Sequence, residues 1–241
     1  MFGWRKRIGY IGPTVLELVP YEFYRFAPDG VGLVGVTCRI DDWSSDQVEN
    51  ELVTAAAAYL GTRAVDFVIH GGGPLVAARG KDFEETIVKD IEAAAKVPAT
   101  TGIRAAMAAL RHMEARRIAI ASPYADRHNQ TLSAYLELHD FEPVRVEGMD
   151  VPFKRMPGIP PADVRRFAAD VIARAPRCDA LYLPSPQWQA AQVVEILERE
   201  SGMPAIAYTH AAFFAAFKAL GIKDPIQGHG RLLASLAQPG R

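Results

Sequence analysis

Three consecutive glycines follow an apolar segment in the first half of the chain. Gly71, Gly72 and Gly73 stand directly before Pro74. A turn of this kind lets the backbone approach an anion closely, and successive amide groups can form a cradle for it. A tight connection between a strand and a helix, in which glycine supplies positive φ, explains the same residues equally well. The chemistry that this turn offers is anion binding by backbone groups.

Hydroxyl groups stand at three other places where an apolar segment ends. Thr14 follows Pro13, Tyr124 directly precedes a predicted helix, and Ser185 stands between two prolines, the second of which is Pro186. The prolines restrict the backbone on both sides of Ser185, so its hydroxyl has a fixed direction. Each hydroxyl can donate a hydrogen bond to an anion, although turn packing or a half-buried structural tyrosine accounts for them nearly as well. No Gly-x-Ser-x-Gly motif surrounds Ser185, which argues against a serine-hydrolase triad.

Histidine is the side chain best suited to proton transfer near neutral pH, and the chain has six of them. His70 precedes the glycine turn and His210 follows Ala-Tyr-Thr, so both lie at ends of predicted strands. A buried, hydrogen-bonded structural role is the alternative for each. No role is predicted for the histidines that fall on helix surfaces or loops, which are His112, His128, His139 and His229.

Short apolar runs alternate with longer helical patterns along the chain, and these elements must position the residues above. The predicted strands are 7–11, 32–37, 64–69, 117–121, 180–183 and 205–207, and the predicted helices are 45–60, 83–95, 102–113, 126–139, 161–175, 189–200 and 210–220. This alternation is typical of parallel sheets covered by helices on both faces. Ligands of open α/β sheets bind beyond the carboxyl ends of strands, where the glycine turn and the Ser185 turn are predicted to lie.

Composition excludes several classes of function. The net charge is -1, from 27 basic and 28 acidic residues without a basic run, so a nucleic-acid partner is not expected. No apolar stretch is long enough to cross a membrane, and the first residues lack a secretion signal, so a cytoplasmic protein is expected. Cys38 and Cys178 lack metal-ligand spacing and are predicted to be free buried thiols, and no metal site is predicted.

A set of short segments spans nearly the whole chain: 9–13, 71–74 with 79–80, 121–126 with Asn129, 179–186, 204–214 and 228–231. Their residues, order and spacing resemble the Asp/Glu racemase superfamily, and most closely its arylmalonate decarboxylases and maleate isomerases. Each segment alone is a weak motif. The resemblance rests on their common order.

The resemblance implies an α/β fold with two similar doubly wound parallel-sheet lobes, of Rossmann-like or flavodoxin-like type, and a site in the cleft between them. We expect residues 1–98 with 205–241 to form the first lobe and residues 99–204 the second. The resemblance also implies a small carboxylate substrate, bound by amides and hydroxyls, and no metal or organic cofactor. It leaves formation of a homo-oligomer open.

The chain departs from this family at both catalytic cysteine positions. Racemases and isomerases of the family use one cysteine from each lobe, whereas the decarboxylase keeps only the second, which reprotonates an enediolate. Here the first position is Gly72 or Gly73 and the second is Ser185. A serine hydroxyl is a far weaker acid than a thiol. Two-cysteine chemistry is therefore not expected. The predicted catalytic residues are His70 and His210, as candidate proton donors, and Ser185.

The function expected from the resemblance is a cofactor-independent decarboxylase or lyase that acts beside a carboxylate and stabilises an enediolate. The alternatives are a maleate-like cis–trans isomerase, a non-catalytic carboxylate-binding relative, and a ring-opening hydrolase of a cyclic imide or lactam. Large aromatic residues can line an apolar pocket beside the carboxylate or pack in the core; these are Trp43, Trp188, Phe213 and Phe214.

Overall fold

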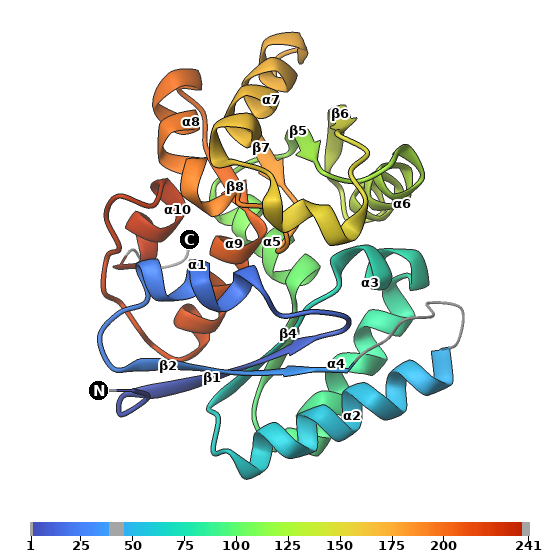
Figure 1. Cartoon of the computed structure of the whole chain (residues 1–241), viewed down its shortest axis with the longest axis vertical. Helices are drawn as coiled ribbons and strands as arrows, with labels where there is room; N and C mark the ends of the chain where they lie inside the picture. Colours follow the sequence, from blue (N-terminus) through green and yellow to red (C-terminus); the bar gives the residue numbers. More distant parts are fainter. Residues whose placement is uncertain (1, 39–45, 238–241) are drawn as a thin grey trace.

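The chain forms two lobes, each built on a four-stranded parallel sheet (Figure 1). The computed structural model describes residues 2–38 and 46–237, and for residues 46–49 it describes the backbone alone. The first sheet has the order β2-β1-β3-β4, and its strands are β1 (Lys6–Gly12), β2 (Val31–Thr37), β3 (Phe67–His70) and β4 (Ala99–Thr101). The second has the order β6-β5-β7-β8, with β5 (Arg117–Ser122), β6 (Glu142–Gly148), β7 (Ala180–Leu183) and β8 (Ala205–Ala207). In each sheet the first strand lies between the second and the third, and the fourth follows the third, so the two lobes have the same topology. This confirms the predicted fold class.

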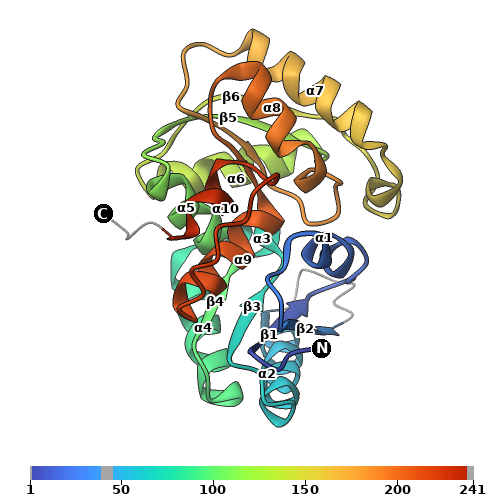
Figure 2. The ribbon, with the colours of Figure 1, turned by 90° about the vertical axis from the view of Figure 1, so that its left-hand side faces the viewer.

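Helices cover both faces of each sheet and fill the space between the lobes. They are α1 (Leu18–Phe26), α2 (Asp46–Thr62), α3 (Gly73–Arg79), α4 (Lys81–Ala95), α5 (Gly102–His112), α6 (Asp126–Glu137), α7 (Pro161–Arg174), α8 (Val194–Ser201), α9 (Tyr208–Ala219) and α10 (Arg231–Ala234), with three short 3-10 turns, η1 (Phe153–Gly158), η2 (Ala191–Val193) and η3 (Ser235–Ala237). Figure 2 shows α9 between the two lobes, where it packs against α5. No helix in the described part of the chain is long and apolar enough to span a bilayer.

Alternate residues of a strand point to opposite faces of its sheet, and the core divides accordingly. In β3, Phe67 and Ile69 join a cluster with side chains of α1, α5 and α9. Val68 instead joins a cluster with side chains of α2 and α4. The first of these clusters also holds Ile120 and Tyr182 of the second sheet. The lobes therefore share one continuous apolar core, which fixes the walls of any site between them.

The six predicted strands are all present, and β3 begins at Phe67 rather than at residue 64. Strands β4 and β6 were missed. Strand β4 has only three residues and runs directly into α5, while β6 is an edge strand that contains Pro143 and two glutamates and is mostly half-buried. Helices α1, α3 and α10 were also missed, because they are short, with nine, seven and four residues, whereas helical periodicity is read over about 11 to 18 residues. Strand β8 pairs with β7 in the second sheet, which differs from the prediction that residues from 205 onward belong to the first lobe.

Candidate functional site

A cavity of about 720 Å³ lies between the lobes, beyond the carboxyl ends of β1, β3, β5, β6 and β7. The structure brings six of the predicted site residues together on its wall: Pro13, Thr14, Gly72, Pro74, Tyr124 and Pro186. The sequence analysis did not assign the remaining wall residues, which are Tyr10, Gly12, Val15, Ala125, Arg127, His128, Asp150, Val151, Pro152, Phe153, Met156 and Gln187. Because both lobes contribute, a ligand here would contact strand ends from each of them.

The glycine turn forms the first-lobe wall and the start of α3. Gly72 has φ +75, and a Cβ atom there would lie 2.6 Å from Cγ of Pro13, so both its conformation and its surroundings require glycine. Gly73 does not line the cavity. A Cβ atom at Gly73 would lie 3.7 Å from the ring of Tyr208, an ordinary contact distance. Of the two glycines predicted for the family's first cysteine position, only Gly73 has room for a Cβ atom.

Tyr124 is the buried hydroxyl of the second-lobe wall. Its phenol donates a hydrogen bond to the carbonyl oxygen of Pro184 at 3.2 Å. Burial raises the pKa of Tyr124 above its usual range, and a hydrogen bond from Ser185 acts in the opposite direction. Ser185 itself is buried, and its Oγ accepts from the amide of Gln187 at 3.2 Å. Tyr124 is thus a neutral donor at neutral pH, and Ser185, its hydrogen-bond neighbour, does not line the cavity.

The first turn of α6 adds a cation and an imidazole to this wall. Arg127 and His128 both line the cavity, and the ring centroids of Tyr124 and His128 are 6.2 Å apart. Burial lowers the pKa of His128, and the charge of Arg127 lowers it further. Sequence reasoning gave His128 no role, although its position four residues after Tyr124, at a helix start, was a usable signal.

An apolar part of the wall comes from the segment that follows β6. Val151, Phe153 and Met156 line the cavity here, together with the carboxylate-bearing Asp150. Met156 is buried, whereas Phe153 remains partly open to solvent. The sequence analysis missed this wall because strand β6 was not predicted.

His70 is not part of the cavity, which corrects the prediction that it donates a proton there. It is fully buried at the end of β3, and its two ring nitrogens have no hydrogen-bond partner in the structure. Its pair on β1 is Ile11, which belongs to the α2–α4 cluster together with Val68. His70 therefore points to the far face of the sheet, where burial lowers its pKa to about 4.

His210 also lies away from this cavity, and its predicted role as proton donor is corrected in the same way. It occupies the first turn of α9 and packs edge-on against Phe26, with ring centroids 5.1 Å apart. Burial lowers its pKa to about 3, and His229 contributes to the shift. His210 lines a second, smaller cavity instead.

The remaining predicted side chains contribute to the core. Trp188, Phe213 and Phe214 are buried in apolar clusters and do not line the cavity, and Trp43 lies outside the described residues. The thiol of Cys38 is buried and that of Cys178 is partly buried, both away from the cavity. Within the described ranges, no group of three His, Cys, Asp or Glu side chains could hold a metal ion.

Comparisons of sequence and of structure both find arylmalonate decarboxylases, and the sequence comparison also finds a maleate isomerase. Arylmalonate decarboxylase of Bordetella bronchiseptica is 26% identical over 233 residues, which cover 93% of this chain and 95% of that protein. Maleate isomerase of Nocardia farcinica is 28% identical over 125 residues, 52% of this chain and 49% of that protein. A mutant arylmalonate decarboxylase, solved in the sulfate ion associated form, has a TM-score of 0.86 at 24% identity and shares the fold over 94% of this chain and 99% of its own.

The family profile described as arylmalonate decarboxylase matches residues 8–233, a range that contains every wall residue of the cavity and both sheets except the first two residues of β1. The chain therefore belongs to the arylmalonate decarboxylase family, with maleate isomerases among its relatives.

Proposed function

We propose that the cavity between the lobes decarboxylates a small malonate-type dicarboxylate. The observation that carries this proposal is the composition of its walls. The walls combine neutral and cationic hydrogen-bond donors, Tyr124 and Arg127, with the apolar side chains of Val151, Phe153 and Met156. A dicarboxylate that loses one carboxylate and keeps the other needs these two environments at once.

The retained carboxylate would bind at the donor side. In this structure the Tyr124 phenol donates to Pro184, and we infer that it turns to the carboxylate when substrate is bound. The Thr14 hydroxyl and the amide of Gly72 would supply further donors, and Arg127 would balance the charge. Hydrogen bonds to a charged group contribute about 1.5 to 3 kcal/mol each, so a few of them suffice to hold a small ligand.

The departing carboxylate would lie against the apolar wall. A carboxylate is destabilised where it has no hydrogen-bond partners, whereas carbon dioxide is neutral and is not. Cleavage of the carbon–carboxylate bond leaves its electron pair on the remaining fragment as an enediolate. The donors that hold the retained carboxylate also stabilise this developing charge.

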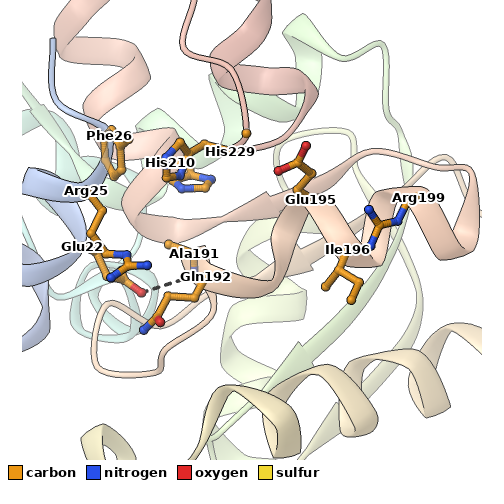
Figure 3. A pocket seen from close by; sticks show the side chains of 11 residues that line it. Glu22, Arg25, Phe26, Ala191, Gln192, Glu195, Ile196, Arg199, His210 and His229 are labelled. Atoms are coloured by element: carbon orange, nitrogen blue, oxygen red, sulfur yellow. Dashed lines mark hydrogen bonds between the residues drawn. The ribbon is translucent and has the colours of Figure 1, made fainter.

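The enediolate carbon must then take one proton, and we infer that His128 provides it. Ser185, at the position predicted for the family's second cysteine, is hydrogen-bonded with Tyr124 and does not line the cavity. His70 points to the far face of its sheet, and His210 lines the second cavity (Figure 3). Among the histidines, all of which the structure describes, His128 is the one on the cavity wall. Its ring is half-buried and can recover its proton from solvent after each turnover.

The residues that line this cavity give less support to the other functions named in the sequence analysis. Isomerisation of a maleate-like diacid by the family route adds a thiolate to a double bond, and neither Cys38 nor Cys178 lines the cavity. A ring-opening hydrolase was suggested by His70, which lies on the far face of the sheet. A non-catalytic carboxylate-binding protein remains the main rival.

Incubation of the purified chain with a series of disubstituted malonates distinguishes a decarboxylase from a non-catalytic carboxylate-binding protein. We expect the monoacid and carbon dioxide in equal amounts, with the rate depending on the apolar substituent that faces Val151, Phe153 and Met156. Ligand-dependent thermal stabilisation without any product would instead identify a binding protein.

A further inference from the structure

The second-lobe wall of the larger cavity contains a polar side chain to which the proposed function gives no role. Gln187 follows Pro186 in the turn after β7, lines the cavity and is only 3% exposed. Its Oε1 is closed off from solvent and has no hydrogen-bond partner in the structure. Buried polar groups in folded proteins are nearly always paired. A carboxamide without partners on a cavity wall therefore indicates a ligand.

The other polar atom of this side chain faces the cavity. Nε2 of Gln187 has no hydrogen-bond partner among the described residues and, unlike Oε1, is not closed off from solvent. Because the residue is almost wholly buried and lies on the cavity wall, this accessible surface belongs to the cavity. The reverse orientation of the carboxamide would bury two N–H donors where a single carbonyl oxygen now lacks a partner, which is less favourable. Gln187 can thus donate to a ligand but cannot accept from one.

The backbone of this turn offers the cavity few donors of its own. Pro184 and Pro186 have no N–H group. The amide of Gln187 already donates to Oγ of Ser185 at 3.2 Å, and Ser185 does not line the cavity. The glycine turn of the first lobe differs, because Gly72 has an amide on the cavity wall. A donor from the turn after β7 must therefore come from a side chain, and Gln187 presents it.

This donor lies close to the hydroxyl of Tyr124. The Tyr124 phenol donates to the carbonyl oxygen of Pro184 and is hydrogen-bonded with Ser185. Ser185 in turn accepts from the amide of Gln187. Tyr124 and Gln187 are thus linked through one residue, and both line the same cavity. A small group with two acceptor oxygens, such as a carboxylate, can accept from both side chains at once.

We propose that Gln187 binds the retained carboxylate of the substrate together with Tyr124, an inference that rests on the function proposed above. Nε2 of Gln187 would donate to one carboxylate oxygen and the Tyr124 phenol to the other. Both donors are uncharged, so directed hydrogen bonds hold the carboxylate on this wall. The site should therefore select a free carboxylate at this position over its methyl ester, because hydrogen bonds to a charged oxygen are the stronger ones.

Calorimetric titration of the full chain with 2-phenylpropionate, the monoacid that methylphenylmalonate would leave, tests the proposal without turnover. We expect the affinity of Gln187→Leu to be lower by about tenfold or more, because a hydrogen bond to a charged group is lost, and the methyl ester of the probe to lose less affinity than the acid. Gln187→Glu has nearly the same shape but places a carboxylate beside that of the probe, and it should bind the acid more weakly still. Gln227→Leu, which changes an exposed glutamine outside the cavity, is the matched control and should bind as the wild type does.

A crystal of the wild-type chain with the same probe gives a measurement that does not depend on the folding of a variant. We expect a carboxylate oxygen at about 2.7 to 3.2 Å from Nε2 of Gln187. The proposal would be overturned by absence of binding to the wild type, by wild-type affinity in both Gln187 variants, by equal losses for the acid and the ester, or by a carboxylate beyond hydrogen-bond distance of Nε2. If the chain decarboxylated no malonate, weaker binding of 2-phenylpropionate by Gln187→Leu would still support this role, so the two proposals fail separately.

Discussion

The rings of Tyr124 and His128 stand 6.2 Å apart on the same wall of the cavity between the lobes. One follows strand β5 and the other lies in the first turn of α6, so the helix start fixes their separation. A neutral phenol that can hold a carboxylate and an imidazole that can deliver a proton are thereby placed within the reach of one small substrate. In the function proposed above, the phenol binds the substrate and the imidazole supplies the proton.

Substitution of the imidazole should separate proton transfer from binding. We expect His128→Gln to lower kcat by about two to four orders of magnitude, the range for loss of a general acid, with ligand affinity largely retained. Wild-type kcat should fall as pH rises through a midpoint below 6.5, because the pKa of His128 is lowered and the charged ring is the donor. His139→Gln is the control. Unchanged kcat in His128→Gln would remove this histidine from the reaction.

His70→Leu should keep wild-type turnover, because the ring lies outside the cavity and its nitrogens are unpaired. Its folded-state pKa of about 4 lies below the unfolded value of about 6.5, so only the unfolded chain binds a proton between these values. Wild-type stability should therefore fall on acidification in this window, by at most about 1.4 kcal/mol per pH unit from this residue. Urea unfolding at pH 7 and 4.5 should show a smaller loss in His70→Leu, and equal losses would contradict this.

The predicted strand ends indicated where the cavity-lining turns lie, but they did not indicate to which face of the sheet a side chain points. The rule that ligands bind beyond the carboxyl ends of parallel strands led to the turns at Gly72, Tyr124 and Pro186, which line the cavity. It could not tell that His70 alternates to the far face, because strand register is not readable from one short apolar run. The apolar wall at Phe153 follows an edge strand without an apolar run, so no sequence pattern marked it.

Glu22 should make the free energy of unfolding depend on pH in the direction opposite to that expected for His70. Its folded-state pKa of about 8 exceeds the unfolded value, so the folded chain alone keeps the proton above about pH 4.5. Stability should then decrease as pH rises from about 4.5 to 8, by at most about 1.4 kcal/mol per unit, and Glu22→Gln should remove this contribution. Denaturant unfolding of both chains at pH 5 and pH 8 measures it. Parallel pH profiles would show that Glu22 ionises freely in the folded chain.

Gly72 and Gly73 should respond differently to the same substitution. Gly72→Ala places a side chain at φ +75 and against Pro13, and we expect it to destabilise the chain by about 1 to 3 kcal/mol. Gly73→Ala meets only ordinary contacts and should change stability by less than about 1 kcal/mol. Thermal unfolding of the two variants provides the comparison. Equal losses would mean that the turn is not held as the structure shows.

Release of carbon dioxide from a disubstituted malonate, followed in the wild type and in Tyr124→Phe side by side, tests the central claim most directly. The wild type should release one carbon dioxide per diacid. Loss of a buried donor to a charged group costs about 1 to 3 kcal/mol, so kcat/KM should fall about 5- to 150-fold in Tyr124→Phe. Tyr59→Phe, an exposed tyrosine outside the cavity, should match the wild type. Equal kcat/KM in the wild type and Tyr124→Phe, or no carbon dioxide from the wild type, would contradict the account.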